Sequence, residues 1–310
     1  MAETILKSTV SAVANNISSE DLHTNMAENS QSFIDYIRYS TIGYPLWQYW
    51  NDVQDPRTAD FFLVNITPYP ILAIMGFYLY FSLSLGPRLM KDRKPFNLKG
   101  TMFIYNTSMA IINAYFVALV LRRCEYGKRF VDWKYPDRNN RSPDAMFELA
   151  MGWWYWMTKF LDLLDTVFFV LRKKHETHIS FLHLYHHTVV PIFGYLCMKH
   201  NGVMPATTLF CLINGTIHVI MYSYYGLCLL GPSVRKYLWW KKYITQMQIG
   251  QFLFGIFYGC IMVFKQEGYP PFWFWFGMTQ PFFFFKLFYD FYRKSYDEQQ
   301  KAKALETKSD

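Results

Sequence analysis

The peptide Lys159-Phe-Leu-Asp-Leu-Leu-Asp-Thr166 lies within residues 145–171, a stretch that is otherwise hydrophobic enough to cross a membrane. At about 100° per residue, its polar side chains fall on one arc of a helix, and its apolar side chains cover the remainder. An ionisable group inside a bilayer is costly unless it faces protein or water. The peptide therefore predicts a membrane helix whose polar stripe, which includes Asp162 and Asp165, faces the interior of a helical bundle.

Three further polar stripes occur in neighbouring apolar stretches. They comprise His183, His186 and His187; then Asn214, His218, Tyr222 and Tyr225; then Thr245, Gln248 and Gln251. The members of each set are spaced so that they share one helix face. Counted at 1.5 Å per residue from the predicted cytosolic helix ends, the stripes lie at similar depths, ~9–20 Å. We therefore predict that the four stripes share one cavity and that the protein is a membrane enzyme.

Seven stretches are long enough to cross ~30 Å of hydrocarbon, which takes about 20 helical residues. They are residues 68–87, 101–121, 145–171, 180–198, 204–230, 237–264 and 270–291. Charged residues are confined to the short runs between these stretches, so the mean hydropathy of zero conceals an alternation. The sequence predicts an all-α membrane protein with a seven-helix domain at 68–292, a luminal segment at 1–67 and a cytosolic tail at 293–310. The polar flanks, roughly 1–40 and 295–310, are expected to be mobile.

The orientation follows from the basic residues in the connections, which favour the cytosol. Residues 1–67 carry three basic and eight acidic residues, whereas residues 88–99 carry five basic and one acidic. This difference predicts a luminal N-terminus and a cytosolic C-terminus. Residues 122–144, luminal in this scheme, oppose it with seven basic and four acidic residues. No cleavable signal peptide is expected, and Asn16 is the preferred glycosylation site on the luminal side.

The five cysteines are too scattered for a disulfide scaffold or a zinc module. Cys124 and Cys260 both lie near luminal ends of predicted spans, in an oxidising compartment, and we predict that they form a disulfide. No cysteine is expected near the polar stripes. This argues against a condensing enzyme that uses a thiol.

Several classes of function are compatible with the residues alone. An enzyme that uses all four stripes needs no metal. The spacing of His175, His178, His183, His186 and His187 also suits metal ligands, as in a histidine-box di-iron fatty acid desaturase or hydroxylase, although such an enzyme needs further histidine boxes and the chain has only eight histidines. A seven-span receptor or carrier explains the span count but not the imidazoles. Nothing in the sequence indicates nucleic-acid binding.

The order of the motifs carries a resemblance to a family. Lys159-x-x-Asp-x-x-Asp-Thr166, His183-x-x-His-His187, the run from Asn214 through His218 to Tyr225, and Thr245-x-x-Gln-x-x-Gln251 resemble the signature motifs of the very-long-chain fatty acid elongases of the endoplasmic reticulum. The resemblance covers essentially all of 60–292. Asp162 stands where the family commonly has Glu, and the usual C-terminal dilysine signal is reduced to Lys308.

This resemblance implies a fold and a reaction. Six of seven transmembrane helices would form an inverted barrel around a narrow acyl tunnel that opens to the cytosol. The enzyme would be a 3-oxoacyl-CoA synthase, an acyltransferase that condenses a long-chain acyl-CoA with malonyl-CoA and releases CO₂ and coenzyme A. It would need no cofactor. The expected partners are acyl-CoA, malonyl-CoA, membrane lipid and the other enzymes of the elongation cycle, with homo-oligomerisation left open.

Roles for the candidate residues follow from this reaction. A neutral imidazole attacks a thioester when a neighbour fixes its tautomer. We assign His186 as the nucleophile, Asp162 or Asp165 as the group that orients the histidines, and Lys159 as their counter-charge. His183 and His187 would transfer protons. His218 and Asn214, with Tyr222 and Tyr225 nearby, would stabilise the malonyl-derived enolate.

The remaining candidates position the substrate. Thr245, Gln248 and Gln251 form a stripe of neutral polar groups that suits substrate positioning, because an amide exchanges no useful proton. The phosphates of coenzyme A are expected to meet cytosolic cations. The candidates are Lys173, Lys174, Arg235, Lys236, Lys241 and Lys242, with Arg293 or Lys294 as further options.

Overall fold

The structure, a computed structural model, describes residues 48, 54–64, 67–201, 204–269 and 271–297. The predicted glycosylation site Asn16, Lys308 and most of the N-terminal segment lie outside these residues. The described residues from Asp55 onward form one compact unit, which is helical without a β-strand. The prediction of an all-α fold is therefore confirmed.

A helix, or a pair of joined helices, occupies each of the seven predicted stretches. In chain order these are α4 (Tyr69–Tyr80) with the π-helical turn η2 (Phe81–Leu85) and α5 (Gly86–Met90); α6 (Lys99–Arg123); α7 (Pro143–Leu161) with α8 (Leu164–Leu171); α10 (Phe181–Leu196) with the π-helical turn η4 (Cys197–Asn201); α11 (Pro205–Cys228); α13 (Lys241–Lys265); and α14 (Pro271–Tyr292). Two short helices, α9 (His175–His178) and α12 (Pro232–Arg235), lie in the connections. The π-helical turn η5 (Arg293–Asp297) continues α14.

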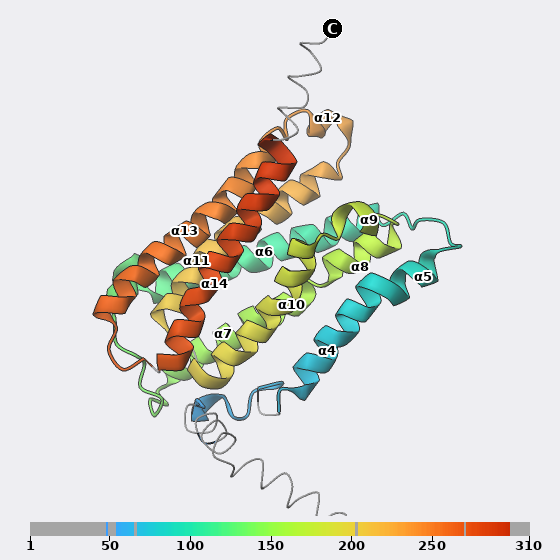
Figure 1. Cartoon of the computed structure of the whole chain (residues 1–310). Helices are drawn as coiled ribbons and strands as arrows, with labels where there is room; N and C mark the ends of the chain where they lie inside the picture. Colours follow the sequence, from blue (N-terminus) through green and yellow to red (C-terminus); the bar gives the residue numbers. More distant parts are fainter. Residues whose placement is uncertain (1–47, 49–53, 65–66, 202–203, 270, 298–310) are drawn as a thin grey trace, which may run out of the picture. The chain divides into compact units, whose positions relative to one another are not determined.

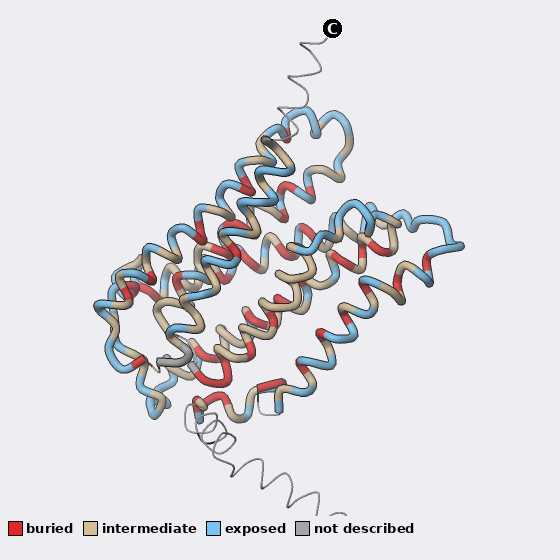
Figure 2. Tube along the Cα trace, in the orientation of Figure 1, coloured by how far each residue is buried: buried red, intermediate tan, exposed pale blue. Residues whose placement is uncertain are grey.

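Four of these helices are long and apolar enough to cross a membrane by length and composition alone. Within the described residues they are Tyr69–Met90, Lys99–Arg123, Pro205–Cys228 and Lys241–Lys265. Their outward faces carry large apolar side chains, for example Ile111, which is 65% exposed, and Phe257, which is also 65% exposed. Figure 2 shows buried residues on the inward sides of these helices and exposed residues along their outer sides. Extended apolar surfaces of this kind suit a hydrocarbon solvent, and they indicate a multi-pass membrane protein.

Six helices follow one another in a closed order of packing. α6 packs along α11, α11 against α13, α13 against α14, α14 against α10, and α10 against α7. The order returns to α6 through the edge-to-face contact of Phe116 with Tyr155 of α7, whose ring centroids are 5.4 Å apart. α4 and α5 lie outside this order, against α10 and α8 (Figure 1). The inward faces of the six helices therefore surround one interior.

The predicted span at 145–171 is divided into two helices. α7 ends with Asp162 as its C-cap, and α8 starts after Leu163. The joint is held by tighter i→i−3 bonds, from the Asp165 amide to the Asp162 carbonyl (3.2 Å) and from the Thr166 amide to the Leu163 carbonyl (3.2 Å). The hydroxyl of Tyr105 on α6 donates to the Leu161 carbonyl at 3.2 Å. The polar motif thus lies at a helix break, where backbone groups need partners from other helices.

α10 contains a proline one turn after the histidines. Pro191 has no amide hydrogen, so the carbonyl of His187 loses its usual partner at i+4. The indole Nε1 of Trp156 on α7 donates to the Pro191 carbonyl at 2.9 Å. A Cβ atom placed on Gly194 would lie 2.2 Å from Cδ1 of the same indole ring. Gly194 therefore lets α10 approach α7 closely, directly beside the histidine cluster.

Replacing Gly194 with alanine is expected to destabilise the fold by about 1–3 kcal/mol, because the rigid indole of Trp156 must move. The measurement is the thermal unfolding midpoint of the purified protein in detergent. Gly76→Ala on α4 is the matched control, since a Cβ atom there meets nothing within 4 Å. That control should match or exceed the wild-type midpoint. Equal midpoints for the wild type and Gly194→Ala would contradict the close approach.

The predicted disulfide between Cys124 and Cys260 is wrong, because both thiols are free. Cys124 is buried in a cluster with Phe130 and Leu209, whereas Cys260 lies on an exposed face of α13. The two side chains therefore belong to different environments. Burial also raises the pKa of the Cys124 thiol, which keeps it protonated and unreactive.

The basic segment 122–144, whose charge opposed the predicted orientation, is partly neutralised by ion pairs. Arg123 pairs with Asp144 at 2.6 Å, and Arg129 pairs with Glu148 at 2.7 Å. The Glu148 hydrogen bond raises the pKa of Arg129, so this pair stays charged. Two arginines of this segment therefore have carboxylate partners at the start of α7.

Candidate active site

The helix break brings a buried cluster of charged and phenolic groups together. Lys159 Nζ donates to Asp162 Oδ2 at 3.1 Å, and the two side chains are only 6% and 4% exposed. The Tyr222 hydroxyl of α11 donates to Asp162 Oδ1 at 2.8 Å and lies 3.1 Å from Asp165 Oδ2. The first and third predicted stripes therefore meet directly. The Tyr105 hydroxyl lies 3.5 Å from that of Tyr222 and extends the cluster to α6.

The histidines of α10 are joined to α8 and α4 through Thr166. The hydroxyl of Thr166 forms a hydrogen bond with His183 Nε2 at 2.7 Å and another with the Tyr78 hydroxyl of α4 at 2.8 Å. The rings of His183 and His187 are 4.3 Å apart, and those of His186 and His187 are 5.3 Å apart. Two side chains in series, Tyr78 and Thr166, therefore hold the His183 ring, and the three imidazoles form one cluster.

Asp162 and Asp165 both accept a hydrogen bond from Tyr222. Within the described residues, no hydrogen bond joins either carboxylate to an α10 imidazole, although Asp162 is close enough to His186 to interact with its charge. Thr166 is the residue that bonds His183. An orienting role for Asp162 or Asp165 stays a prediction.

His186 lies between polar and aromatic surroundings. Its ring packs near Phe284 and Phe288 of α14, at centroid distances of 5.7 Å and 6.4 Å. It is also close enough to Asp162 and Lys159 to interact with their charges. In the described part of the chain, neither ring nitrogen of His186 has a hydrogen-bond partner. The imidazole therefore keeps its nitrogens available beside an apolar wall.

His218 reaches the same interior from α11. It is 6% exposed, and it interacts with the charges of Lys159 and Asp162 and with His186. His187 interacts with His218 in the same way. The His218 Nδ1 atom is buried and has no hydrogen-bond partner among the described residues. A buried polar atom without a partner is costly, so a ligand atom at this position would be stabilising.

Asn214 lies one turn from His218 and is linked to two other helices. Its Oδ1 accepts from the Tyr155 hydroxyl of α7 at 3.1 Å, and its Nδ2 lies 3.5 Å from Gln251 Oε1 of α13. The ammonium of Lys159 lies 4.8 Å above the Tyr155 ring. The fourth stripe is thus connected to the first through Asn214 and Tyr155.

The other members of the stripes have different surroundings. Thr245 is buried on α13, whereas Gln248 contacts the Met221 sulfur at 3.8 Å. Tyr225 is 40% exposed, touches the edge of the Tyr222 ring with centroids 6.4 Å apart, and is close enough to Asp165 to interact with its charge. Tyr225 therefore adjoins the carboxylates, whereas no contact in the described residues joins Thr245 or Gln248 to them.

The predicted cations divide into groups. Lys174 and Lys241 both lie close enough to His178 of α9 to interact with it, as does Arg172. Burial lowers the pKa of His178, and these cations lower it further, against a backbone hydrogen bond that raises it. Lys173 instead points to α5, where its Nζ donates to the Lys91 carbonyl at 2.8 Å. The Arg235 Nε donates to the Cys228 carbonyl (3.2 Å), while Lys236 and Lys242 lie over the rings of Tyr237 and Tyr243.

Two observations bear on other chemistries. Among the described residues, no group of three His, Cys, Asp or Glu side chains is arranged to hold a metal ion. The expectation that no cysteine lies near the stripes is wrong, because Cys211 of α11 interacts with Lys159, Tyr155 and Cys197. Cys211 precedes Asn214 by three residues and therefore shares its helix face.

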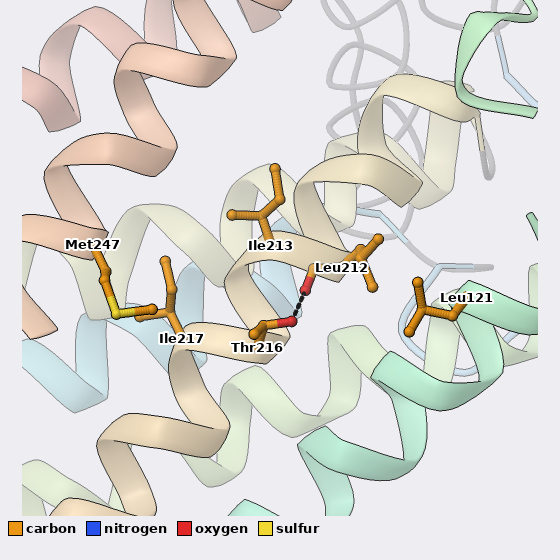
Figure 3. Close-up of a pocket in the computed structure, with 6 residues that line it drawn as sticks. All are labelled: Leu121, Leu212, Ile213, Thr216, Ile217 and Met247. Carbon is orange, nitrogen blue, oxygen red and sulfur yellow. Dashed lines mark hydrogen bonds between the residues drawn. The ribbon is translucent and has the colours of Figure 1, made fainter. Parts of the chain in front are cut away.

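The cavity drawn in Figure 3 is not part of this site. It has a volume of about 450 Å³ and is lined by Leu121, Leu212, Ile213, Thr216, Ile217 and Met247. By helical spacing these α11 residues lie on the face away from Asn214 and His218. Its one hydroxyl, that of Thr216, donates to the Leu212 carbonyl at 2.8 Å (Figure 3). The cavity is therefore an apolar hollow without a group that could take part in catalysis.

Four site residues were missed by the sequence reasoning. Tyr78, Tyr105 and Tyr155 lie in apolar spans, and no polar stripe around them marks their direction. Phe284 belongs to the aromatic run 272–285, whose many Phe and Trp residues do not show which one faces the site. It is 7% exposed, and it stacks on Phe252 with ring centroids 5.3 Å apart beside His186.

Comparison with known proteins shows which family the chain matches. Residues 63–304 match the family described as ELO: GNS1/SUR4 family. The chain is 37% identical over 259 residues to very long chain fatty acid elongase 7 of Rattus norvegicus, covering 81% of this chain and 89% of that protein. It is 35% identical over 272 residues to very long chain fatty acid elongase 4 of Homo sapiens, covering 86% of this chain and 83% of that protein.

Proposed function

This chain belongs to the ELO family, GNS1/SUR4, and we propose that it is a membrane enzyme of fatty acid elongation that joins a long-chain acyl-CoA to malonyl-CoA. The products are a 3-oxoacyl-CoA, CO₂ and free coenzyme A. The observation that carries the proposal is the convergence of Lys159, Asp162, His186 and His218 from three helices in one interior. Such a group of buried titratable residues needs a function to offset its cost.

The first half-reaction is transfer of the acyl group to His186. A nitrogen of the neutral imidazole attacks the thioester carbon, the carbon–sulfur bond breaks, and coenzyme A leaves as a thiolate. The acylated ring loses its N–H proton to give the neutral acyl-imidazole, and that proton is taken up by the thiolate. His187 and His183 are the nearest groups that can move that proton. The wall formed by Phe284, Phe288 and Phe252 suits the apolar acyl chain.

The second half-reaction forms the new carbon–carbon bond. Malonyl-CoA loses CO₂, and the electron pair of the broken bond becomes an enolate on the thioester. Donors preorganised at the developing oxyanion stabilise it, and His218 is buried in a position to do so, with Asn214 one turn away. The enolate carbon attacks the acyl carbon, and the electrons of the acyl–nitrogen bond return to His186, which takes up a proton from water to become neutral again. The kinetics should therefore be ping-pong.

The six helices α6, α7, α10, α11, α13 and α14 would form the barrel around the acyl tunnel, with α4 outside it. Their closed order of packing supports this arrangement. The enzyme would cross the endoplasmic reticulum membrane seven times, with its N-terminus in the lumen and its C-terminus in the cytosol. It would use no cofactor and would pass its product to the other enzymes of the cycle.

The phosphates of coenzyme A would bind the cations around His178. Lys241→Ala is expected to raise KM for both acyl-CoA substrates about 10-fold or more with little change in kcat, because it removes a charge-assisted contact worth about 1.5–3 kcal/mol. Initial-rate kinetics measure the effect. Lys265→Ala, at the opposite end of α13, is the control and should leave KM within about twofold. A fall in kcat at unchanged KM would contradict the assignment.

The proposed reaction is tested with purified protein in vesicles, labelled malonyl-CoA and a series of acyl-CoA chain lengths. Labelled 3-oxoacyl-CoA and CO₂ should form in equal amounts, and only when both substrates are present. Saturable acyl-CoA binding without CO₂ release would contradict the proposal and favour a carrier. Activity that depends on oxygen and on bound iron would favour the desaturase alternative.

A further inference from the structure

A second hollow lies outside the six-helix interior, between α5 and the connection from α8 to α9. It has a volume of about 510 Å³ and is lined by Pro87, Arg88, Met90, Lys91, Lys173, His175 and Glu176. α5 ends the span Tyr69–Met90, so the hollow lies where that span leaves the membrane on the predicted cytosolic side. It is separated from Thr166 by about two turns of α8.

The lining is strongly basic and is not neutralised by the chain. Arg88, Lys91 and Lys173 face one carboxylate, that of Glu176. Within the described residues no carboxylate lies within ion-pair distance of any of the three cations. The Lys173 ammonium donates to a neutral group, the Lys91 carbonyl, at 2.8 Å. Like charges gathered in one hollow repel one another, and an anion would offset that repulsion.

The backbone holds Lys173 in an unusual conformation. The Lys173 amide donates to the Val170 carbonyl at 2.9 Å, and the Lys174 amide donates to the Phe169 carbonyl at 2.8 Å, which is the Schellman pattern. Lys173 has a φ of +54° at the position that glycine usually occupies. This conformation turns the lysine side chain away from Lys174 and toward α5. Lys173 therefore contributes its charge to the lining from a left-handed backbone conformation. Glycine could adopt this conformation at position 173 without strain.

His175 also lines the hollow, from the start of α9. Its Nδ1 is buried and lacks a hydrogen-bond partner among the described residues. The donors of the hollow are therefore the guanidinium of Arg88 and the ammonium groups of Lys91 and Lys173.

We propose that this hollow binds a phosphate group, held by Arg88, Lys91 and Lys173. Guanidinium and ammonium groups around one space suit a phosphate better than they suit a carboxylate, because a phosphate offers more oxygens and more negative charge. Two sources share this chemistry: the headgroup of an anionic lipid in the adjoining leaflet and a soluble phosphate compound. The site goes beyond the proposed acyl transfer, since it shares no residue with the cluster of Lys159, His186 and His218.

The test is the unfolding midpoint of the purified full-length protein in neutral detergent, titrated with dioctanoyl phosphatidic acid, dioctanoyl phosphatidylcholine, inorganic phosphate or coenzyme A. Phosphatidic acid should raise the midpoint, and phosphatidylcholine should not. In Lys173→Gly, the concentration of phosphatidic acid that gives the same rise in the midpoint should increase about 10-fold or more. The midpoint of this variant without ligand should stay at or above the wild-type value. Lys94→Gln, which removes a charge from the same connection but not from the lining, should respond like the wild type.

The titrations with inorganic phosphate and coenzyme A distinguish a lipid from a soluble source of phosphate, and the hollow from the active site. A response to inorganic phosphate that matches the response to phosphatidic acid, and that Lys173→Gly weakens, would support a soluble source. A coenzyme A response that is lost in Lys241→Ala and kept in Lys173→Gly would belong to the active site and would be consistent with two separate sites. The proposal is overturned if no phosphate compound shifts the midpoint, or if Lys173→Gly and Lys94→Gln respond alike. None of these results depends on acyl transfer, so they are independent of the proposed enzyme activity.

Discussion

His186→Ala is expected to lower the rate of condensation at least about 10³-fold, because it removes the proposed nucleophile, which lies close to Asp162 and Lys159 and against the aromatic wall of α14. His186→Gln should be equally inactive, although it retains a polar side chain of similar length. Labelled malonyl-CoA incorporation with a saturating acyl-CoA measures both variants. The loss should appear in kcat, since neither variant removes a phosphate contact.

Tyr185→Phe is the matched control for these variants. It lies on the same turn of α10, and its ring stacks on Phe181 with centroids 5.8 Å apart. Removing its hydroxyl should change the rate by less than about twofold. Retention of a substantial fraction of the wild-type rate in a folded His186→Ala protein would contradict the role of nucleophile.

Asp162→Asn is expected to destabilise the protein by about 3–5 kcal/mol, because it leaves the Lys159 ammonium buried without its counter-charge. The measurement is again the unfolding midpoint in detergent, together with the condensation rate. Lys159→Met combined with Asp162→Leu should recover most of the stability, since the pair is then replaced by apolar groups of similar size. The double variant should remain inactive, because Tyr222 and the imidazoles lose the charges that they face.

The exposed pair of Lys286 and Asp290 on α14 provides the control for Asp162→Asn. Its side chains are 70% and 50% exposed, so Asp290→Asn should change stability by less than about 1 kcal/mol. An active double variant would mean that the buried pair only neutralises its own charge. Equal stabilities for Asp162→Asn and Asp290→Asn would contradict the burial of the pair.

The sequence was sufficient to predict the helices and the convergence of the stripes. The apolar stretches are long and bounded by charged runs, and a helix occupies each of them. The spacing of His183, His186 and His187 places them on one face, and their rings are in contact. Both results depend on local periodicity, which a sequence carries.

Other features depend on contacts between helices and could not be read from periodicity. The polar spacing of Lys159, Asp162 and Asp165 continues through the break after Asp162, and it is Tyr222 and Tyr105 that satisfy the groups there. The free Cys124 and Cys260 follow from the outward direction of Cys260 on α13. The direction of Lys173 follows from a backbone conformation that lysine rarely adopts.

The most direct test of the central claim is mass spectrometry of the enzyme after incubation with a long-chain acyl-CoA alone. The account predicts one acyl group on the tryptic peptide 175–199, and fragment ions must place it on His186, because the same peptide contains Cys197. Repeating the experiment with Cys197→Ser removes that ambiguity. An unmodified His186 in an enzyme that turns over, or an acyl group on Cys197 or Cys211, would contradict the account.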